Sequence, residues 1–227
     1  MTMLIIACVV FVGGHVLLSG TPLRGVIVRV IGETAFLGLF SVIALASIVW
    51  MAWAYADSDY VELWHAGHAL KGIAWLVMTP AVILVVCGNA TPNPSSVGSE
   101  KVLEREDAAR GIFSVTRHPL MWGIALWAAA HLLANGDLAS LIFFASLLVL
   151  VFAGVASQEA KKKAKMGEAW DRFAAATSFV PFVAIVERRR TLDWKGIGWW
   201  RLGLSALIYV ALVLLHPWVI GVSPLPT

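Results

Sequence analysis

Two of the six histidines in this chain lie inside strongly apolar stretches, where an ionisable side chain is unusual. His15 and His131 both interrupt runs of hydrophobic residues. In a membrane such groups cost free energy and usually face the interior of a helix bundle. A neutral imidazole binds iron well, and helix bundles build haem pockets from facing side chains. His15 and His131 are therefore candidate iron ligands, with a hydrogen-bonded core histidine as the alternative for each.

A second group of ionisable residues lies at the beginning of the segment that ends at His131. Its sequence is Thr116-Arg117-His118-Pro119. Proline suits the first turn of a helix, and free backbone amides beside a guanidinium favour an anion such as a phosphate or carboxylate. The alternative is a basic anchor at the membrane face. At 1.5 Å per residue, His118 and His131 are about 20 Å apart, so one small cofactor does not use both.

The other histidines carry weaker signals. His65 and His68 are spaced to share a helix face, with Glu62 also in step, which allows a metal site but favours an interfacial polar cluster. His216-Pro217 is expected to end the last apolar segment.

The composition is that of an integral membrane protein. Hydrophobic residues make up 59% of the chain and charged residues 14%, and the mean hydropathy is +0.82. Eleven tryptophans suit two membrane interfaces. Cys8 and Cys87 lie in separate apolar segments, which argues against a disulfide framework, and a Cys-x-x-Cys-His site for c-type haem is missing. The expected partner is thus the lipid bilayer and not nucleic acid, and the oligomeric state is left open.

The apolar runs predict an all-α, polytopic transmembrane bundle in one domain, residues 1–227. We expect about six spans, the first being a retained span and not a signal peptide. The Asn135-Gly136-Asp137 turn makes a helical hairpin of the fourth and fifth. The predicted spans are Met3–Ser19, Thr34–Tyr55, Gly67–Gly88, Pro119–Ala134, Leu138–Ser157 and Gly196–Val219.

The loop charges predict the orientation. Lys and Arg gather in the connections after spans one, three and five, whereas the connections 56–66 and 135–137 hold acidic residues and no Lys or Arg. By the positive-inside rule the basic loops are cytoplasmic, and both termini are then periplasmic. The segment Gln158–Phe173 also has an amphipathic pattern. It predicts either a helix on the membrane surface or a solvated extension of span five.

Several motifs resemble the NnrU family of membrane proteins from about His15 to the C-terminus. They are the run from Thr116 to Gly123, the run from Leu126 to Asp137, Thr91-Pro92-Asn93-Pro94, Gly167-Glu168-Ala169-Trp170, Gly198-Trp199-Trp200-Arg201 and His216-Pro217-Trp218. The resemblance implies a bacterial inner-membrane protein linked to denitrification and nitric oxide metabolism, as an enzyme or as a non-enzymatic accessory factor.

The same resemblance extends to zeta-carotene isomerase, a haem b enzyme that isomerises a cis double bond in a carotenoid. It implies haem b in this chain, with His15 and His131 as axial ligands and a lipophilic substrate. The relative has a cysteine three residues before the second ligand, where this chain has Ala128. The helical rise places His15 and His131 about 10 Å apart in depth, so a haem that bridges them would be tilted.

A shorter similarity links the Arg-His-Pro segment to membrane methyltransferases of the isoprenylcysteine and phospholipid type and to sterol reductases. It implies S-adenosylmethionine or NADPH bound near the cytoplasmic face. The residues that would hold it here are Arg117, His118 and Glu159.

Overall fold

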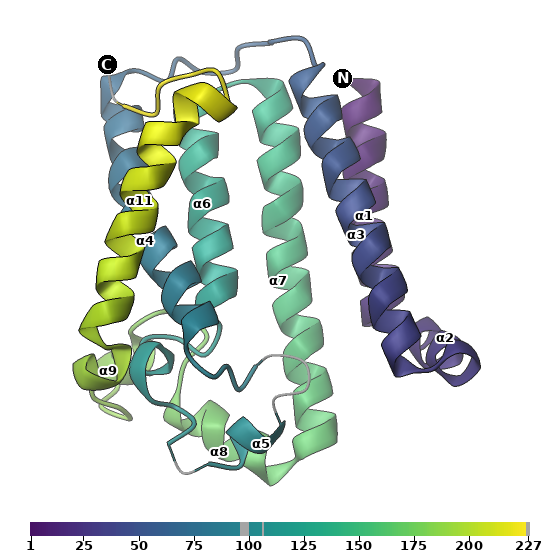
Figure 1. Ribbon diagram of the computed structural model, residues 1–227, viewed down its shortest axis with the longest axis vertical. Helices are drawn as coiled ribbons and strands as arrows, with labels where there is room; N and C mark the ends of the chain where they lie inside the picture. The colour runs from purple at the N-terminus through teal and green to yellow at the C-terminus, as the bar shows by residue number, and fades with distance from the viewer. Residues whose placement is uncertain (96–99, 106, 226–227) are drawn as a thin grey trace.

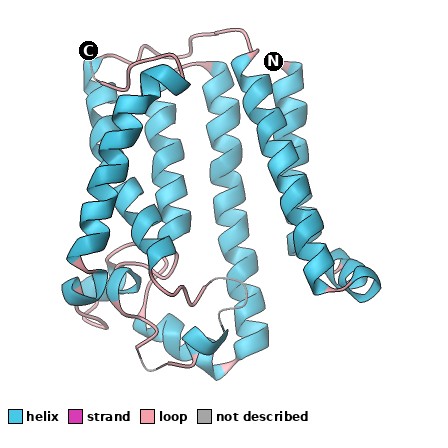
Figure 2. Cartoon of the chain, viewed as in Figure 1, coloured by secondary structure: helices cyan, strands magenta, loops and turns pink. Residues whose placement is uncertain are grey.

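The structure, a computed structural model, describes residues 1–95, 100–105 and 107–225, and this part of the chain is a helical bundle without a β-strand (Figures 1 and 2). The long helices are α1 (Thr2–Gly20), α3 (Glu33–Ala56), α4 (His68–Ala90), α6 (Pro119–Asn135), α7 (Leu138–Met166) and α11 (Trp199–Val219). The short ones are α2 (Leu23–Ile31), α5 (Glu100–Leu103), the 3-10 helix η1 (Gly111–Ser114), α8 (Glu168–Ala176), α9 (Val183–Val186) and α10 (Trp194–Ile197).

The long helices confirm the predicted all-α polytopic bundle. Five of them are long and apolar enough to cross a membrane, and α6, with 17 residues, is slightly shorter. It lies between α4 and α7, so protein covers much of its surface (Figure 1). Both termini lie at the same end of the bundle (Figure 1), as an even number of crossings requires. We call this end the outer end, and the opposite one, which carries the basic loops, the inner end.

Small residues let α4 and α6 pack closely. A Cβ atom on Gly123 would lie 2.5 Å from the Val85 side chain and 2.9 Å from the carbonyl oxygen of Ala81. On the other helix, a Cβ on Gly88 would lie 3.1 Å from Pro119, which occupies the first turn of α6 as predicted. Close backbone approach through glycine is a common way for membrane helices to associate.

The Asn-Gly-Asp turn forms the predicted hairpin between α6 and α7. Gly136 adopts φ +70°, and a Cβ there would collide with the carbonyl oxygen of Trp64. The carboxylate of Asp137 accepts the backbone N–H of Ser140 and caps α7. The backbone N–H groups of Leu63 and Trp64 both donate to the Gly136 carbonyl, so the turn also fixes the loop that leads into α4.

The segment Gln158–Phe173 is divided between two helices, so the predicted extension of span five holds only as far as Met166. Helix α7 continues past the membrane-length part to Met166, and the chain then turns at Gly167, with φ +49°, into α8. The apolar side chains of α8, Trp170 and Phe173, are buried against Phe113 and its neighbours in an inner-end core. The hydrophobic face of α8 is therefore covered by protein and not by lipid.

Candidate functional site

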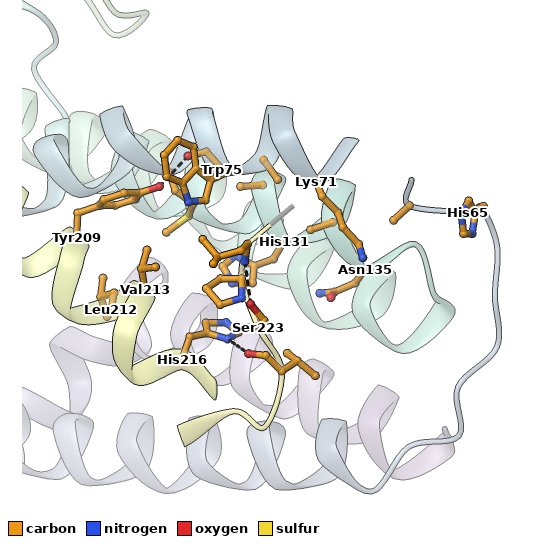
Figure 3. Close-up of a pocket in the computed structure, with 18 of the residues that line it drawn as sticks. His65, Lys71, Trp75, His131, Asn135, Tyr209, Leu212, Val213, His216 and Ser223 are labelled. Carbon is orange, nitrogen blue, oxygen red and sulfur yellow. Dashed lines mark hydrogen bonds between the residues drawn. The ribbon is translucent and has the colours of Figure 1, made fainter. Parts of the chain in front are cut away.

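An outer-end cavity between α4, α6 and α11 contains one of the two predicted iron ligands. Its volume is about 390 Å³, and His131 lines it together with His216 (Figure 3). Much of the wall is apolar or aromatic, including Trp75 and Leu212, while Lys71 adds a polar group. The volume falls in the range of about 300–1,000 Å³ that is typical of small-molecule sites.

His131 has the local geometry of a metal-ligating histidine. Its Nδ1 lies 2.8 Å from the carbonyl oxygen of Trp127, one helical turn earlier. Such a bond places the proton on Nδ1 and leaves the Nε2 lone pair available, which is the usual second contact of a histidine that binds a metal. The rings of Trp127 and Phe144 pack against the imidazole at centroid distances of 4.9 and 5.0 Å and fix its orientation.

His216 is a functional candidate that the sequence did not reveal, because its place before Pro217 suggested only a helix terminus. In the structure α11 continues to Val219, and His216 lines the same cavity as His131. Its Nδ1 lies 2.8 Å from the carbonyl oxygen of Val222, in the tail that folds back over the helix end (Figure 3). Its Nε2 is therefore also left available. Only the tertiary arrangement, which places α6 and α11 around one cavity, brings His216 to attention.

His15, the other predicted ligand, lies elsewhere in the bundle. Its Nδ1 is 2.8 Å from the carbonyl oxygen of Phe11, and its ring packs against Phe11 and Phe40. It does not line the outer cavity. Counted from the outer ends of their helices, Thr2 and Asn135, His15 and His131 differ in depth by roughly 13 Å. The ring geometry thus suits a ligand at both histidines, but the cavity holds only His131.

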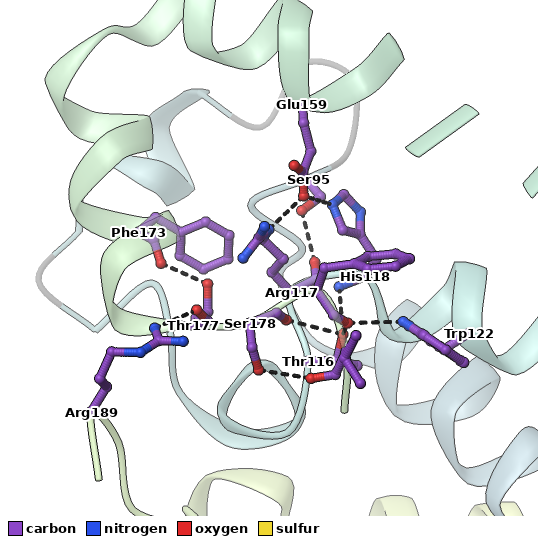
Figure 4. A network of polar contacts seen from close by, with 12 residues as sticks. Ser95, Thr116, Arg117, His118, Trp122, Glu159, Phe173, Thr177, Ser178 and Arg189 are labelled. Atoms are coloured by element: carbon purple, nitrogen blue, oxygen red, sulfur yellow. Dashed lines mark hydrogen bonds and ion pairs between the residues drawn. The ribbon is translucent and has the colours of Figure 1, made fainter. Parts of the chain in front are cut away.

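The predicted cofactor-binding residues Arg117 and His118 meet Glu159 at the inner end (Figure 4). The Glu159 carboxylate oxygen Oε1 accepts a hydrogen bond from Arg117 Nε at 2.5 Å and lies 2.9 Å from His118 Nε2. Glu159 of α7 thus meets two residues at the start of α6, Arg117 and His118. The Arg117 guanidinium and the Glu159 carboxylate carry opposite charges, so their ion pair joins the two helices.

Further hydrogen bonds hold this inner group in place. Ser95 donates to the carbonyl oxygen of Arg117, and the Thr116 hydroxyl donates to that of Phe179. The indole of Trp122 donates to the same Phe179 carbonyl at 2.8 Å (Figure 4). His118 is 2% exposed, and its Nδ1 has no hydrogen-bond partner in the part of the chain that the structure describes.

The described part of the chain brings few metal-ligating side chains together. Within the described residues, no three His, Cys, Asp or Glu side chains are grouped so that they could hold a metal ion by themselves. His65 lies before α4 begins, with its side chain 88% exposed and 3.5 Å from Glu62. His65 forms an exposed polar pair with Glu62, and it also lines the outer cavity with His131 and His216 (Figure 3).

Comparisons with known proteins agree with the motifs. The family described as "NnrU protein" matches residues 3–224. The 15-cis-zeta-carotene isomerase of Zea mays chloroplasts is 26% identical over 167 residues, which are 72% of this chain and 45% of that protein. The corresponding isomerase of Arabidopsis thaliana is 32% identical over 82 residues, which are 36% of this chain and 22% of that protein.

This chain therefore spans less than half the length of the curated relatives that it matches. No solved structure matches it. The family match nevertheless covers almost all of the chain and includes the Arg-His-Pro helix, His131 and the His216-Pro217-Trp218 segment. The chain is a membrane-helical member of the NnrU family, with weaker homology to 15-cis-zeta-carotene isomerase.

Proposed function

We propose that this protein binds haem b at the outer cavity through His131 and acts on a lipophilic substrate with a cis double bond. The observation that carries the proposal is the geometry of His131. Its Nδ1 is bonded to a backbone carbonyl, its ring is held by Trp127 and Phe144, and it lines a largely apolar cavity. Bound haem would supply a redox-active iron beside a substrate that enters from the bilayer.

Two residues are candidates to hold the haem together with His131. The resemblance implies His15, whose Nδ1 is likewise bonded to a backbone carbonyl, but His15 lies outside this cavity and differs from His131 by roughly 13 Å in depth, so the two could share one iron only if their helices shifted. His216 is offered by the cavity itself, because it lines the same cavity as His131 from a different helix, α11. The role of the other lining residues is to exclude water: Trp75, Leu212 and Val213 surround the histidines with apolar surface.

The substrate class is proposed from two sources. The curated relatives carry the name 15-cis-zeta-carotene isomerase, and two of the helices around the cavity, α4 and α11, are long and apolar enough to cross a membrane. The departure from the isomerase at Ala128, which is fully buried, means that a cysteine thiol cannot act at this position.

An optical spectrum tests the haem assignment. The full-length protein, expressed with added haem and purified in detergent, is expected to show a Soret band that His131→Ala abolishes or shifts. The exposed histidine at the start of α4 supplies the matched control, and His68→Ala should leave the band unchanged. A wild-type protein without a Soret band, or a His131→Ala variant with the wild-type spectrum, would contradict the proposal.

The same spectra separate the two candidate second ligands. Loss of the six-coordinate spectrum in His15→Ala and not in His216→Ala would assign His15, and the reverse result would assign His216. Incubation of the haem-loaded protein with 15-cis-zeta-carotene, followed by chromatography of the isomers, tests the reaction. A haem-loaded protein that leaves this substrate unchanged would contradict the isomerase activity and favour an accessory role.

A further inference from the structure

A second, polar cavity lies at the inner end, away from the histidines of the proposed haem site. Its volume is about 200 Å³. It is formed where the end of α4, the segment after α5 and the start of α11 meet. Thr91 and Arg201 both line this cavity, although they are 110 residues apart in the sequence. Each belongs to a motif noted in the sequence: Thr91 begins Thr91-Pro92, and Arg201 ends the Gly-Trp-Trp-Arg segment.

The lining is strongly basic. Three arginines, Arg105, Arg110 and Arg201, line this cavity against one carboxylate, Asp107. That carboxylate is already engaged, because Arg110 Nη1 donates to it at 3.0 Å. The side chain of Arg105 has no hydrogen bond or ion pair with any residue that the structure describes. A positive charge beyond what the carboxylate can balance therefore remains around the cavity.

Arg201 is held rigidly, with part of its guanidinium to spare. Its Nε donates to the carbonyl oxygen of Ala90 at 3.1 Å, and its Nη1 donates to that of Ile197 at 2.9 Å. The guanidinium also stacks on Trp200, 4.5 Å from the ring centroid. These contacts cap the last turn of α4 and join it to α11, but they leave Nη2 without a partner in the described chain. A fixed guanidinium with free N–H groups is well suited to bind the oxygens of an anion.

A buried hydroxyl at the same cavity also lacks a partner. Thr91 is 5% exposed, and its Oγ1 is one of two buried side-chain polar atoms without a hydrogen bond in the described chain. A buried hydroxyl without a hydrogen bond is unfavourable, because it has lost its bonds to water and gained none. A ligand oxygen in the cavity would satisfy it, and this independent observation indicates a ligand.

The cavity lies at the depth where two membrane-length helices, α4 and α11, end. Thr91 follows the last residue of α4, and Arg201 is the third residue of α11, and these two ends lie at the inner end of the bundle (Figure 1). The cavity has room for several water molecules at about 30 Å³ each, which is enough for a phosphate-sized group. Lipid phosphates lie at this level of a bilayer.

We propose that this cavity is a binding site for a phosphate group, with Arg105, Arg201 and the Thr91 hydroxyl as its main ligands. The group belongs either to an anionic lipid or to a soluble phosphate, and the two sources share the same recognition chemistry. This site does not depend on haem binding, so its test and the spectra above succeed or fail separately.

Two variants test the site without removing the contacts that join α4 to α11. Thr91→Val keeps the shape of the side chain and removes only the unpartnered hydroxyl, and Arg105→Gln removes an exposed charge that has no described partner. The matched control is Arg172→Gln, because Arg172 is 70% exposed on α8 and does not line the cavity. All three variants should fold, since none removes a buried hydrogen bond.

Binding is measured in two arms on the full chain. Titration with inorganic phosphate at constant ionic strength, in neutral detergent, reports a soluble ligand. Native mass spectrometry from nanodiscs of phosphatidylglycerol or phosphatidylcholine reports a retained anionic lipid. In whichever arm the wild type binds, Arg105→Gln should weaken binding roughly tenfold or more and Thr91→Val roughly three- to tenfold, with Arg172→Gln unchanged.

Three results would overturn the proposal. The first is a wild type that binds neither phosphate nor phosphatidylglycerol. The second is wild-type binding in both Thr91→Val and Arg105→Gln. The third is an equal loss in Arg172→Gln and Arg105→Gln, which would show a general surface charge effect.

Discussion

His118 Nε2 lies 2.9 Å from the Oε1 atom of Glu159, on a helix that begins 20 residues after the histidine. Arg117 Nε donates to the same oxygen, so one carboxylate ties the start of α6 to the inner part of α7. The imidazole is buried, and the guanidinium is largely so. The Arg-His-Pro sequence therefore serves to anchor the helix that carries His131.

Removing the carboxylate should loosen this anchor. In Glu159→Ala, His118 stays buried without its acceptor, and we expect a loss of about 1–3 kcal/mol in the free energy of unfolding. For a chain of this size, each kcal/mol lowers the melting temperature by about 2–4 °C. Thermal unfolding in detergent measures the effect. Glu168→Ala is the control, because Glu168 is 97% exposed, and equal melting temperatures for the two variants would refute the anchor.

The α4–α6 contact should tolerate no added volume at Gly123. The Cβ of Gly123→Ala would lie 2.5 Å from the Val85 side chain and 2.9 Å from the Ala81 carbonyl oxygen. We expect a cost of about 1–3 kcal/mol and a change in the outer cavity, since α4 and α6 both contribute to its wall. Gly154→Ala is the control, because its Cβ would meet nothing within 4 Å. A melting temperature for Gly123→Ala at or above that of Gly154→Ala would disagree with the packing.

Asp193 should make stability depend on pH. Hydrogen bonds from the backbone N–H of Gly111, at 2.7 Å, and of Gly196, at 2.8 Å, hold the pKa of Asp193 below its ordinary value. Because the folded pKa is the lower one, this stabilisation is complete above the unfolded pKa of about 4 and is lost as the pH falls through the folded pKa.

Melting curves of the wild type and Asp193→Asn, recorded from about pH 6 to pH 3, test this dependence. The amide presents an NH₂ group to two N–H donors, so the variant should be less stable at pH 6 and should approach the wild type at low pH. Asp171→Asn, with an exposed carboxylate, serves as the control. A constant difference between wild type and Asp193→Asn across this range would contradict the assignment.

The orientation can be tested with single cysteines. Cys8 and Cys87 are buried, so they should not react with a membrane-impermeant maleimide. If the basic loops are cytoplasmic, Asp59→Cys at the outer end should be labelled in cells with a permeable outer membrane, and Arg172→Cys only after lysis. The opposite labelling pattern would invert the topology.

The sequence by itself determined the class of the protein and the places of its spans. Apolar runs of about 20 residues have no other stable solution than membrane helices, and the Asn-Gly-Asp turn and Pro119 marked the limits of α6 because their backbone chemistry is local. The motifs were also sufficient to predict the family, which the match over residues 3–224 confirmed.

Only the tertiary structure decided which of these residues meet. The packing of α4, α6, α7 and α11 decides three such meetings. His216 lines the cavity of His131, Glu159 contacts His118, and Arg201 lines the same cavity as Thr91. The helical period gives the face and depth of a residue along its own helix, but the rotation and neighbours of that helix are set by close packing at residues such as Gly123. For this reason the sequence could name His131 as a candidate ligand, but it could not show that His216 shares its cavity.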